Sequence, residues 1–224
     1  NSYFAIVKIQ ESTQHESVRH WISKKFLQRI EETIDEITQC NYEMKRTNTL
    51  LIKKSNSFDV ILSAKEEEIS EDNEIRVLLE TIPLIYQHSS VEEMSNFNKA
   101  LTRLLTSFAP NIEYHKKDIS YLPFFKLIVE CVINIFSLAK KNIIPTKCAN
   151  TLIQNMISAT FNIYTDLSNY INNPQYSDMR ISSYFSCLIH LVAEGVDLLA
   201  EKEIIIIQQL FVTLVMSWDD LLTS

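Results

Sequence analysis

Apolar residues recur along most of this chain at steps of three and four positions, which is the spacing of an amphipathic α-helix. A weak alternation of apolar and polar residues, closer to a strand pattern, occurs only at the start, in "NSYFAIVKIQ". The periodicity predicts helices over these ranges: Glu16–Lys54, Glu74–His88, Val91–Phe108, Leu122–Lys141, Thr146–Tyr170, Met179–Ala200 and Lys202–Leu222.

Several of these helices begin or end at residues that favour a helix boundary. Ser90 stands before "VEEM", with Glu93 three residues later, and this pair is the signature of a capping box. Pro145 precedes the helix predicted from Thr146, where proline is well tolerated. The prolines of "SFAPN" and "NNPQ" mark breaks between helices, which agrees with the boundaries that the periodicity gives.

The helices from Leu122 onward are more apolar than the first one. In "CVINIFSLAKKNII" apolar side chains cover most of the helix circumference, which is typical of a helix inside a bundle. The run Ile204–Ile207 points to all sides of a helix. We therefore expect it to be buried core, covered by Met179–Ala200 on one side and by the helices of Leu122–Tyr170 on the other.

The chain has a single glycine, Gly195, among 224 residues. Tight hairpins, bulges and phosphate-binding loops need glycine at positive φ, whereas helices joined by polar loops do without it. The sequence therefore predicts an all-α fold without a sheet, a single domain over residues 1–224 built as an irregular bundle of about seven to nine helices. No consensus recurs at a fixed period, so a regular solenoid is not predicted. Gly195 falls inside a predicted helix, where a missing side chain allows close helix approach.

Two segments lie outside the regular helices. Residues 1–15 are expected to form an extended arm or a short helix, and the pattern leaves both open. The stretch "AKEEEISEDNE" (Ala64–Glu74) is polar and acidic, so we expect a mobile loop there.

The chain is acidic, with a formal net charge of −7 and a pI of about 5.3. A nucleic-acid-binding domain usually has the opposite sign. Basic residues do gather between Arg19 and Lys54, but acidic residues alternate with them, which favours a solvated helix face. Nucleic-acid binding through this early helix is therefore the alternative, and direct nucleic-acid contact is not the leading expectation.

The sequence predicts no membrane span. The apolar run Leu127–Ala139 contains Glu130, and "IIIIQQLFVTLVMSW" carries two glutamines. Both runs are shorter than the roughly 20 residues that a bilayer-spanning helix needs. The cysteines lie far apart in apolar surroundings, as reduced thiols in the core of a nuclear or cytoplasmic protein do. They are Cys40, Cys131, Cys148 and Cys187.

The sequence carries no motif for catalysis, for a metal or for a cofactor. A single glycine excludes glycine-rich nucleotide loops, and neither HExxH nor the ExxH set of di-iron bundles occurs. A zinc site that His15 and His20 share with ligands of a partner is left open. His190 follows Cys187 on a mostly apolar helix, and we expect a hydrogen-bonded core histidine there rather than a catalytic base. The expected protein is not an enzyme and needs no metal or cofactor.

The first long helix carries an apolar seam whose steps alternate between three and four residues, as in a coiled coil. Asn41 and Asn48 fall at a-type positions of the same frame, where asparagine fixes register and oligomeric state. Two interpretations stay open: the seam packs along its own domain, or part of it meets a second chain. Trp21 is either a core residue or an interface anchor. The candidate protein-binding residues are Trp21, Leu27, Ile30, Ile34, Ile37 and Met44.

The size of the chain, its number of long helices and the early helix "WISKKFLQRIEETIDEI" resemble the TRF-homology-like helical domains of telomere shelterin proteins, including the bridge subunit. The resemblance implies a homodimer that docks peptide segments of partner proteins, and it carries over no functional residue. The leading expectation is a non-enzymatic interaction module, a dimerising or bridging adaptor in a multiprotein complex. An irregular HEAT-like scaffold is a further alternative.

Overall fold

The computed structural model describes residues 16–51, 65–108, 121–171 and 179–199, together with the helical positions 204, 205, 207–209, 212, 213 and 216. These residues form helices and turns and contain no strand, so the all-α prediction is confirmed. The elements are α2 (Glu16–Leu51), α3 (Lys65–Tyr86), α4 (Val91–Ser107), α5 (Tyr121–Lys140), α6 (Thr146–Ile171), α7 (Met179–Gly195) and the 3-10 helix η2 (Val196–Leu198).

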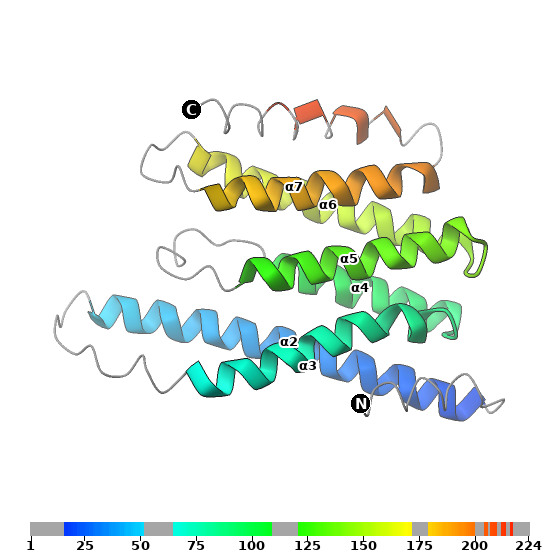
Figure 1. Cartoon of the computed structure of the whole chain (residues 1–224), viewed down its shortest axis with the longest axis horizontal. Coiled ribbons are helices and arrows are strands. Elements are labelled where there is room, and N and C mark those ends of the chain that lie inside the picture. The colour runs from blue at the N-terminus through cyan, green and yellow to red at the C-terminus, as the bar shows by residue number, and fades with distance from the viewer. Residues whose placement is uncertain are drawn as a thin grey trace.

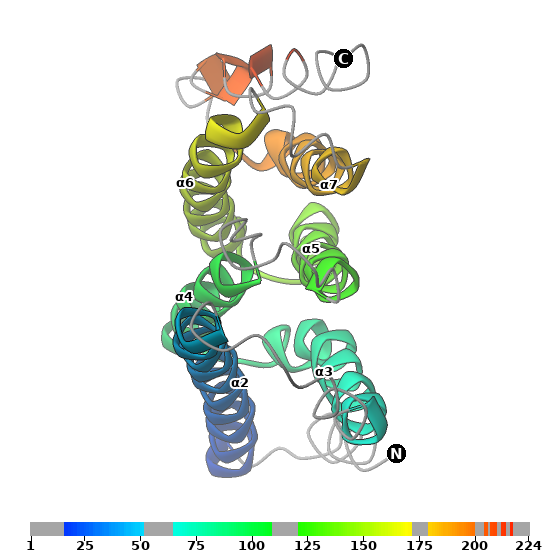
Figure 2. The same cartoon turned by 90° about the vertical axis from the view of Figure 1, so that its left-hand side faces the viewer.

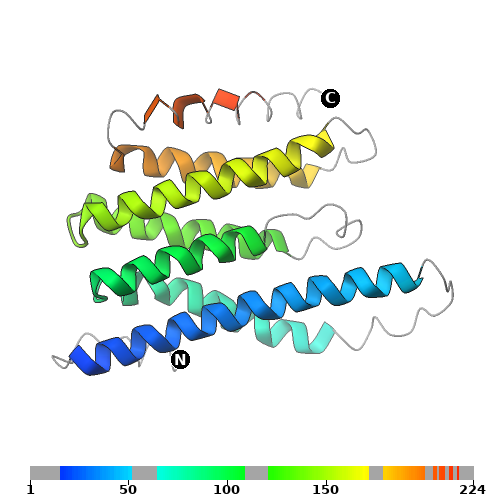
Figure 3. The same ribbon diagram turned by 180° about the vertical axis from the view of Figure 1, so that it is seen from behind.

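The helices are arranged in two layers, which are easiest to see in Figure 2. One layer contains α2, α4 and α6, the other contains α3, α5 and α7, and each helix makes its most extensive contacts with the next helix of its own layer. Figure 1 shows the stack running from α2 and α3 at one end to α6 and α7 at the other, and Figure 3 shows it from behind. Successive helical hairpins therefore stack in chain order, as they do in helical repeat proteins.

The leading prediction was an irregular bundle, and stacked hairpins entered only as the alternative of an irregular HEAT-like scaffold, for a simple reason. The helices of the first layer begin at Glu16, Val91 and Thr146, and these starts are unequally spaced along the chain. Stacking needs only that each hairpin presents an apolar face to the next. A fixed period in the sequence is therefore not required, and none is found.

The starts of α2, α4, α6 and α7 agree with the predicted helix starts. The loop predicted over Ala64–Glu74 is wrong, because α3 already begins at Lys65. Glutamate and lysine are good helix formers, and acidic residues interact favourably with the positive end of the helix dipole. A polar stretch can therefore form the first turns of a helix, and Ile75, the first residue of α3 whose side chain the structure describes, packs against the core. Residues 1–15, the predicted arm, lie outside the described residues.

The core lies between the two layers and is rich in aromatic side chains. Phe125 of α5 meets Tyr184 of α7 nearly edge-on, with 4.9 Å between ring centroids. Tyr164 of α6 meets Phe185 of α7 in the same way at 5.8 Å. Edge-to-face contacts of this kind add to the free energy gained by burying the rings, so they stabilise both the stacking and the pairing of the layers.

A buried polar chain joins three helices. The Tyr86 hydroxyl at the end of α3 donates to Asn98 Oδ1 of α4 at 2.8 Å, and Asn98 Nδ2 donates to the backbone carbonyl of Cys148 in α6 at 3.0 Å. Tyr86 and Asn98 are almost completely buried. Burial raises the pKa of the Tyr86 hydroxyl well above its ordinary value, so this group stays a hydrogen-bond donor.

One segment of α5, Leu122–Lys140, is long and apolar enough to cross a membrane by length and composition alone. The expectation that the apolar run in this region is too short is wrong, because the run extends back to Leu122. In the structure α5 lies between α3 and α7, and Phe125, Ile128 and Val132 have no exposed surface. A buried core helix passes the same test of length and composition, and α5 is packed as one.

Candidate protein-binding surface

The predicted seam of the first helix packs largely inside the chain. Ile30 and Ile34 are buried, Leu27 is half-buried against the core, and α2 makes its main contacts with α4. Ile30 and Ile34 therefore serve the domain itself, and Leu27 keeps only part of its surface free for a partner. The side chains of Ile37 and Met44 lie outside the described residues.

Trp21 is the member of the predicted set that the structure places at the surface, with 56 % of its side chain exposed. The residues beside it tie α2 to the start of α4. His20 Nδ1 donates to Glu93 Oε1 at 2.9 Å, and the hydroxyls of Ser23 and Ser89 are 3.1 Å apart. These bonds hold the backbone around Trp21 in place, so the indole is presented on a fixed helix.

Glu93 also completes the capping box predicted from the sequence. Its Oε2 accepts from the Ser90 backbone N–H at 2.7 Å, and its own N–H donates to Ser90 Oγ at 3.3 Å. Burial acts to raise the pKa of Glu93, but the bonds from Ser90 and His20 outweigh it and hold that pKa below its ordinary value. The carboxylate therefore stays ionised at neutral pH and links two helices.

The basic residues of the early helix are partly neutralised by carboxylates. Arg29 Nη1 lies 3.1 Å from Glu36 Oε1 and 3.5 Å from Glu32 Oε2. Arg103 of α4 pairs with Glu31 of α2. Such pairs leave less positive charge for phosphate groups than the sequence count suggests.

The cysteines and histidines show no arrangement for catalysis in the described part of the chain. Cys131 and Cys148 are buried and Cys187 is half-buried, and all three are free thiols. Burial raises the pKa of each of these thiols, which disfavours the thiolate that a nucleophile or metal ligand needs. Among the described residues no group of three or more His, Cys, Asp or Glu side chains could hold a metal ion.

His190 is a further correction to the sequence interpretation. It was expected in the core, but its side chain is exposed on α7. The buried side of α7 is formed by Phe185, Leu188 and Leu191, and His190 lies on the opposite side of the helix wheel, facing out. An apolar sequence context did not determine on which side of the helix the histidine lies.

The isoleucine run near the end of the chain is only partly buried, which corrects a further prediction. Ile207 is 4 % exposed, whereas Ile205 is 62 % exposed and Ile204 is intermediate. The segment that carries them lies at one end of the stack, next to α6 and α7 (Figures 1 and 2). A helix at the end of a stack is covered from one side only, so one side of the run must face outward. Ile206 lies outside the described residues.

The exposed stripe of this terminal segment carries three large apolar side chains, with the polar Gln208, Gln209 and Thr213 exposed beside them. Ile205, Val212 and Met216 are 62 %, 59 % and 60 % exposed, and Gln209 lies between them. The steps from 205 to 209, 212 and 216 are four, three and four residues, so these side chains share one helix face. The same spacing is present in the sequence, but a run of four isoleucines is also typical of a buried helix.

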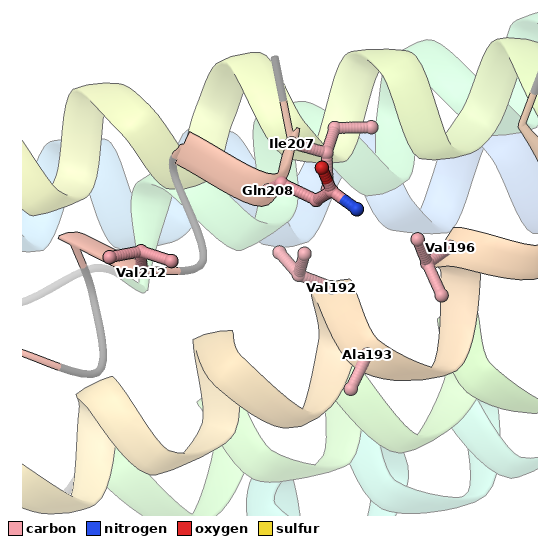
Figure 4. A pocket seen from close by; sticks show the side chains of 6 residues that line it. All are labelled: Val192, Ala193, Val196, Ile207, Gln208 and Val212. Carbon is pink, nitrogen blue, oxygen red and sulfur yellow. The ribbon is translucent and has the colours of Figure 1, made fainter. Parts of the chain in front are cut away.

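An apolar hollow of about 270 Å³ lies beside this stripe. Figure 4 shows Val192 and Val196 projecting toward the segment that carries Ile207 and Gln208, with Val212 further along the same segment. Ala193, also at the rim, is exposed. The complete lining is Val192, Ala193, Val196, Ile207, Gln208 and Val212. Gln208 is the one polar side chain among these six, so the hollow can accept aliphatic side chains but offers little for a charged ligand.

An ion-pair group joins the end of α5 to α7 and η2. Lys140 Nζ is 3.4 Å from Glu194 Oε2 and 3.5 Å from Asp197 Oδ2. Both carboxylates follow directly after hollow-lining residues, Ala193 and Val196. Two carboxylates share one ammonium group, so this cluster carries one negative charge in excess.

Comparisons of the chain with protein-family models, with curated proteins and with solved structures found no match. Function is therefore inferred from the residues and their geometry.

Proposed function

We propose that this chain is a non-enzymatic protein-interaction module that docks an apolar segment of a partner protein on the end of its helix stack. The docking surface, called here the apolar end, consists of the hollow-lining residues Val192, Ala193, Val196, Ile207, Gln208 and Val212 with the exposed residues Ile205 and Met216.

The observation that carries this proposal is the exposed stripe Ile205, Val212 and Met216 at the end of a stacked array. Three large aliphatic side chains, each more than half exposed and next to an apolar hollow, are typical of a face that another protein covers.

The other expectations from the sequence receive less support. Two chains cannot pair through Ile30 and Ile34 of the early helix, because both side chains are buried inside the domain. Nucleic-acid binding through the same helix is weakened by the pairing of Arg29 with Glu32 and Glu36. Membership of a telomere shelterin-like complex stays a prediction from architecture, and it adds no residue to the proposed surface.

Affinity purification of the protein from cells that make it, followed by quantitative mass spectrometry, tests the proposal. The double variant Val212→Glu, Met216→Glu places two charges on the exposed stripe, so we expect it to lose the proteins that co-purify with the wild type. Because both positions are exposed, the free energy of unfolding of the variant should differ from that of the wild type by no more than about 0.5 kcal/mol.

Phe161→Glu is the matched control for this experiment. Phe161 is 56 % exposed on α6, a similar exposure to that of Val212 and Met216, but it does not line the hollow. We expect this variant to keep the wild-type partners. An identical set of partners for all three proteins would rule out the apolar end as the docking surface.

A further inference from the structure

Trp21 lies on a basic part of α2, although the chain as a whole is acidic. From Ser17 to Ile30 the helix contains arginine and lysine but no aspartate or glutamate, whereas the formal net charge of the chain is −7. Lys24 and Lys25 follow Trp21 by three and four positions, and these steps place the three side chains on one face of the helix. All three are exposed, so an indole ring and two ammonium groups are presented together at the surface.

The positive charges of Lys24 and Lys25 are not neutralised by carboxylates of the described residues, since no ion pair joins either lysine to one of them. Lys25 Nζ donates to Gln28 Oε1 at 3.1 Å, which is an uncharged acceptor. Glu93 of α4 is buried, and both of its carboxylate oxygens already accept hydrogen bonds. Both ammonium groups are therefore available to an anionic ligand.

The length of the basic segment limits the kind of ligand that fits. The segment ends at Glu16 and Glu31, so it is about 20 Å long, which matches about six residues of an extended peptide. A nucleic-acid strand needs a longer basic path and several aromatic rings on which successive bases stack. Trp21 is the one exposed aromatic side chain in the described part of α2, so the chemistry favours a short acidic peptide.

We infer that Trp21, Lys24 and Lys25 form a second docking site, which binds a short acidic segment of a partner protein with an aliphatic or aromatic residue next to its carboxylates. The carboxylates pair with the two lysines, and the apolar side chain packs on the indole ring. α2 lies at the end of the stack opposite to the terminal segment (Figure 1), so this site is separate from the apolar end and does not depend on the proposed function. With both sites occupied, the chain joins two partner segments.

Binding of three defined probes to the full chain, measured by fluorescence anisotropy of a dye on each probe, tests this inference. The first is a peptide of about eight residues, with Leu and Phe at its centre and Asp and Glu at the other positions. The second peptide has lysine in place of every Asp and Glu, and the third probe is an oligothymidylate of about twelve nucleotides. We expect the acidic peptide to bind at least about tenfold more tightly than either of the other probes.

Variants of the protein locate the binding. Trp21→Ala and the double variant Lys24→Glu, Lys25→Glu should each weaken binding of the acidic peptide at least about tenfold. The matched control is Lys141→Glu with Lys147→Glu, which reverses the charge of two exposed lysines on another part of the stack and should leave binding unchanged. Circular dichroism melting of each variant shows whether the fold is kept, and all of the substituted side chains are exposed.

The other outcomes overturn this inference without affecting the proposed function. Failure of the acidic peptide to bind, or equal binding of both peptides, shows that the site does not recognise acidic segments. Tighter binding of the oligonucleotide, lost in Lys24→Glu with Lys25→Glu, assigns the basic surface to nucleic acid instead. Acidic-peptide binding that persists in Trp21→Ala and in the double lysine variant, but is lost in Val212→Glu with Met216→Glu, places the peptide at the apolar end.

Discussion

Ile153 of α6 fills the space next to Gly195 that a side chain would need. A β-carbon on residue 195 would lie 1.6 Å from Ile153 Cδ1, 2.9 Å from Ile153 Cγ1 and 3.0 Å from Phe136 Cε2 of α5. The φ angle of Gly195 is −92°, which any residue can adopt, so the position requires glycine for space and not for backbone conformation. The single glycine of the chain therefore allows the close helix approach that its position in the sequence predicted.

Gly195→Ala is expected to lower the free energy of unfolding by about 1–3 kcal/mol, because the added methyl group overpacks a buried site. Ile153→Val in the same chain removes the Cδ1 atom that the methyl group meets first. We expect the double variant to be more stable than the sum of the two single effects predicts. Urea unfolding of the four proteins measures this coupling, and strictly additive effects would show that the Ile153 contact is not the cause.

Ile205→Ala and Ile207→Ala should differ in their effect on stability, although the two residues belong to one run. Ile207 is buried, so its truncation should cost about 2–5 kcal/mol. Ile205 is mostly exposed, and its truncation should change stability by no more than about 0.5 kcal/mol. Thermal melting of the two variants checks this, and equal losses of stability would mean that the run is covered on both sides.

Acid is expected to weaken the contact between α2 and α4 through Glu93. The pKa of Glu93 is lower in the folded protein than in the unfolded chain, so the folded state binds its proton less readily. The stability contributed by this carboxylate is complete above the unfolded pKa and is lost as the pH falls through the folded pKa.

Glu93→Gln isolates this contribution because the amide does not ionise. We expect the wild type to lose its stability advantage over the variant as the pH is lowered below the ordinary pKa of a glutamate. Unfolding curves of both proteins between neutral and acidic pH measure the difference. A difference in stability that does not change with pH would mean that Glu93 acts through packing alone.

The buried chain from Tyr86 through Asn98 to the Cys148 carbonyl should behave as a unit. Asn98→Leu leaves both the Tyr86 hydroxyl and the Cys148 carbonyl without this partner, so we expect a loss of about 2–4 kcal/mol. Tyr86→Phe removes a single hydroxyl and should cost less. In the Asn98→Leu background Tyr86→Phe should be nearly neutral, because the hydroxyl has already lost its acceptor, and a full additional loss in urea unfolding would argue against the chain.

The sequence determined the helical elements of this protein because those depend on local chemistry. One glycine, capping residues such as Ser90 and Glu93, and apolar steps of three and four were enough to predict an all-α fold and the starts of four helices. The early boundary of α3 was missed because its first residues have no apolar face. Helix formation there follows from the propensity of Glu and Lys and from the contacts of Ile75 and later residues.

The tertiary structure alone decided which apolar residues are covered. Ile30 and Ile207 are buried while Ile205 and Val212 are exposed, although all four lie in apolar helical patterns. The pattern of a helix shows which side chains share a face, but burial depends on whether another helix lies against that face. The order of stacking placed α4 against the seam of α2 and left the outer stripe of the terminal segment uncovered. For that reason the proposed docking surface lies on the terminal segment and not on the seam of α2.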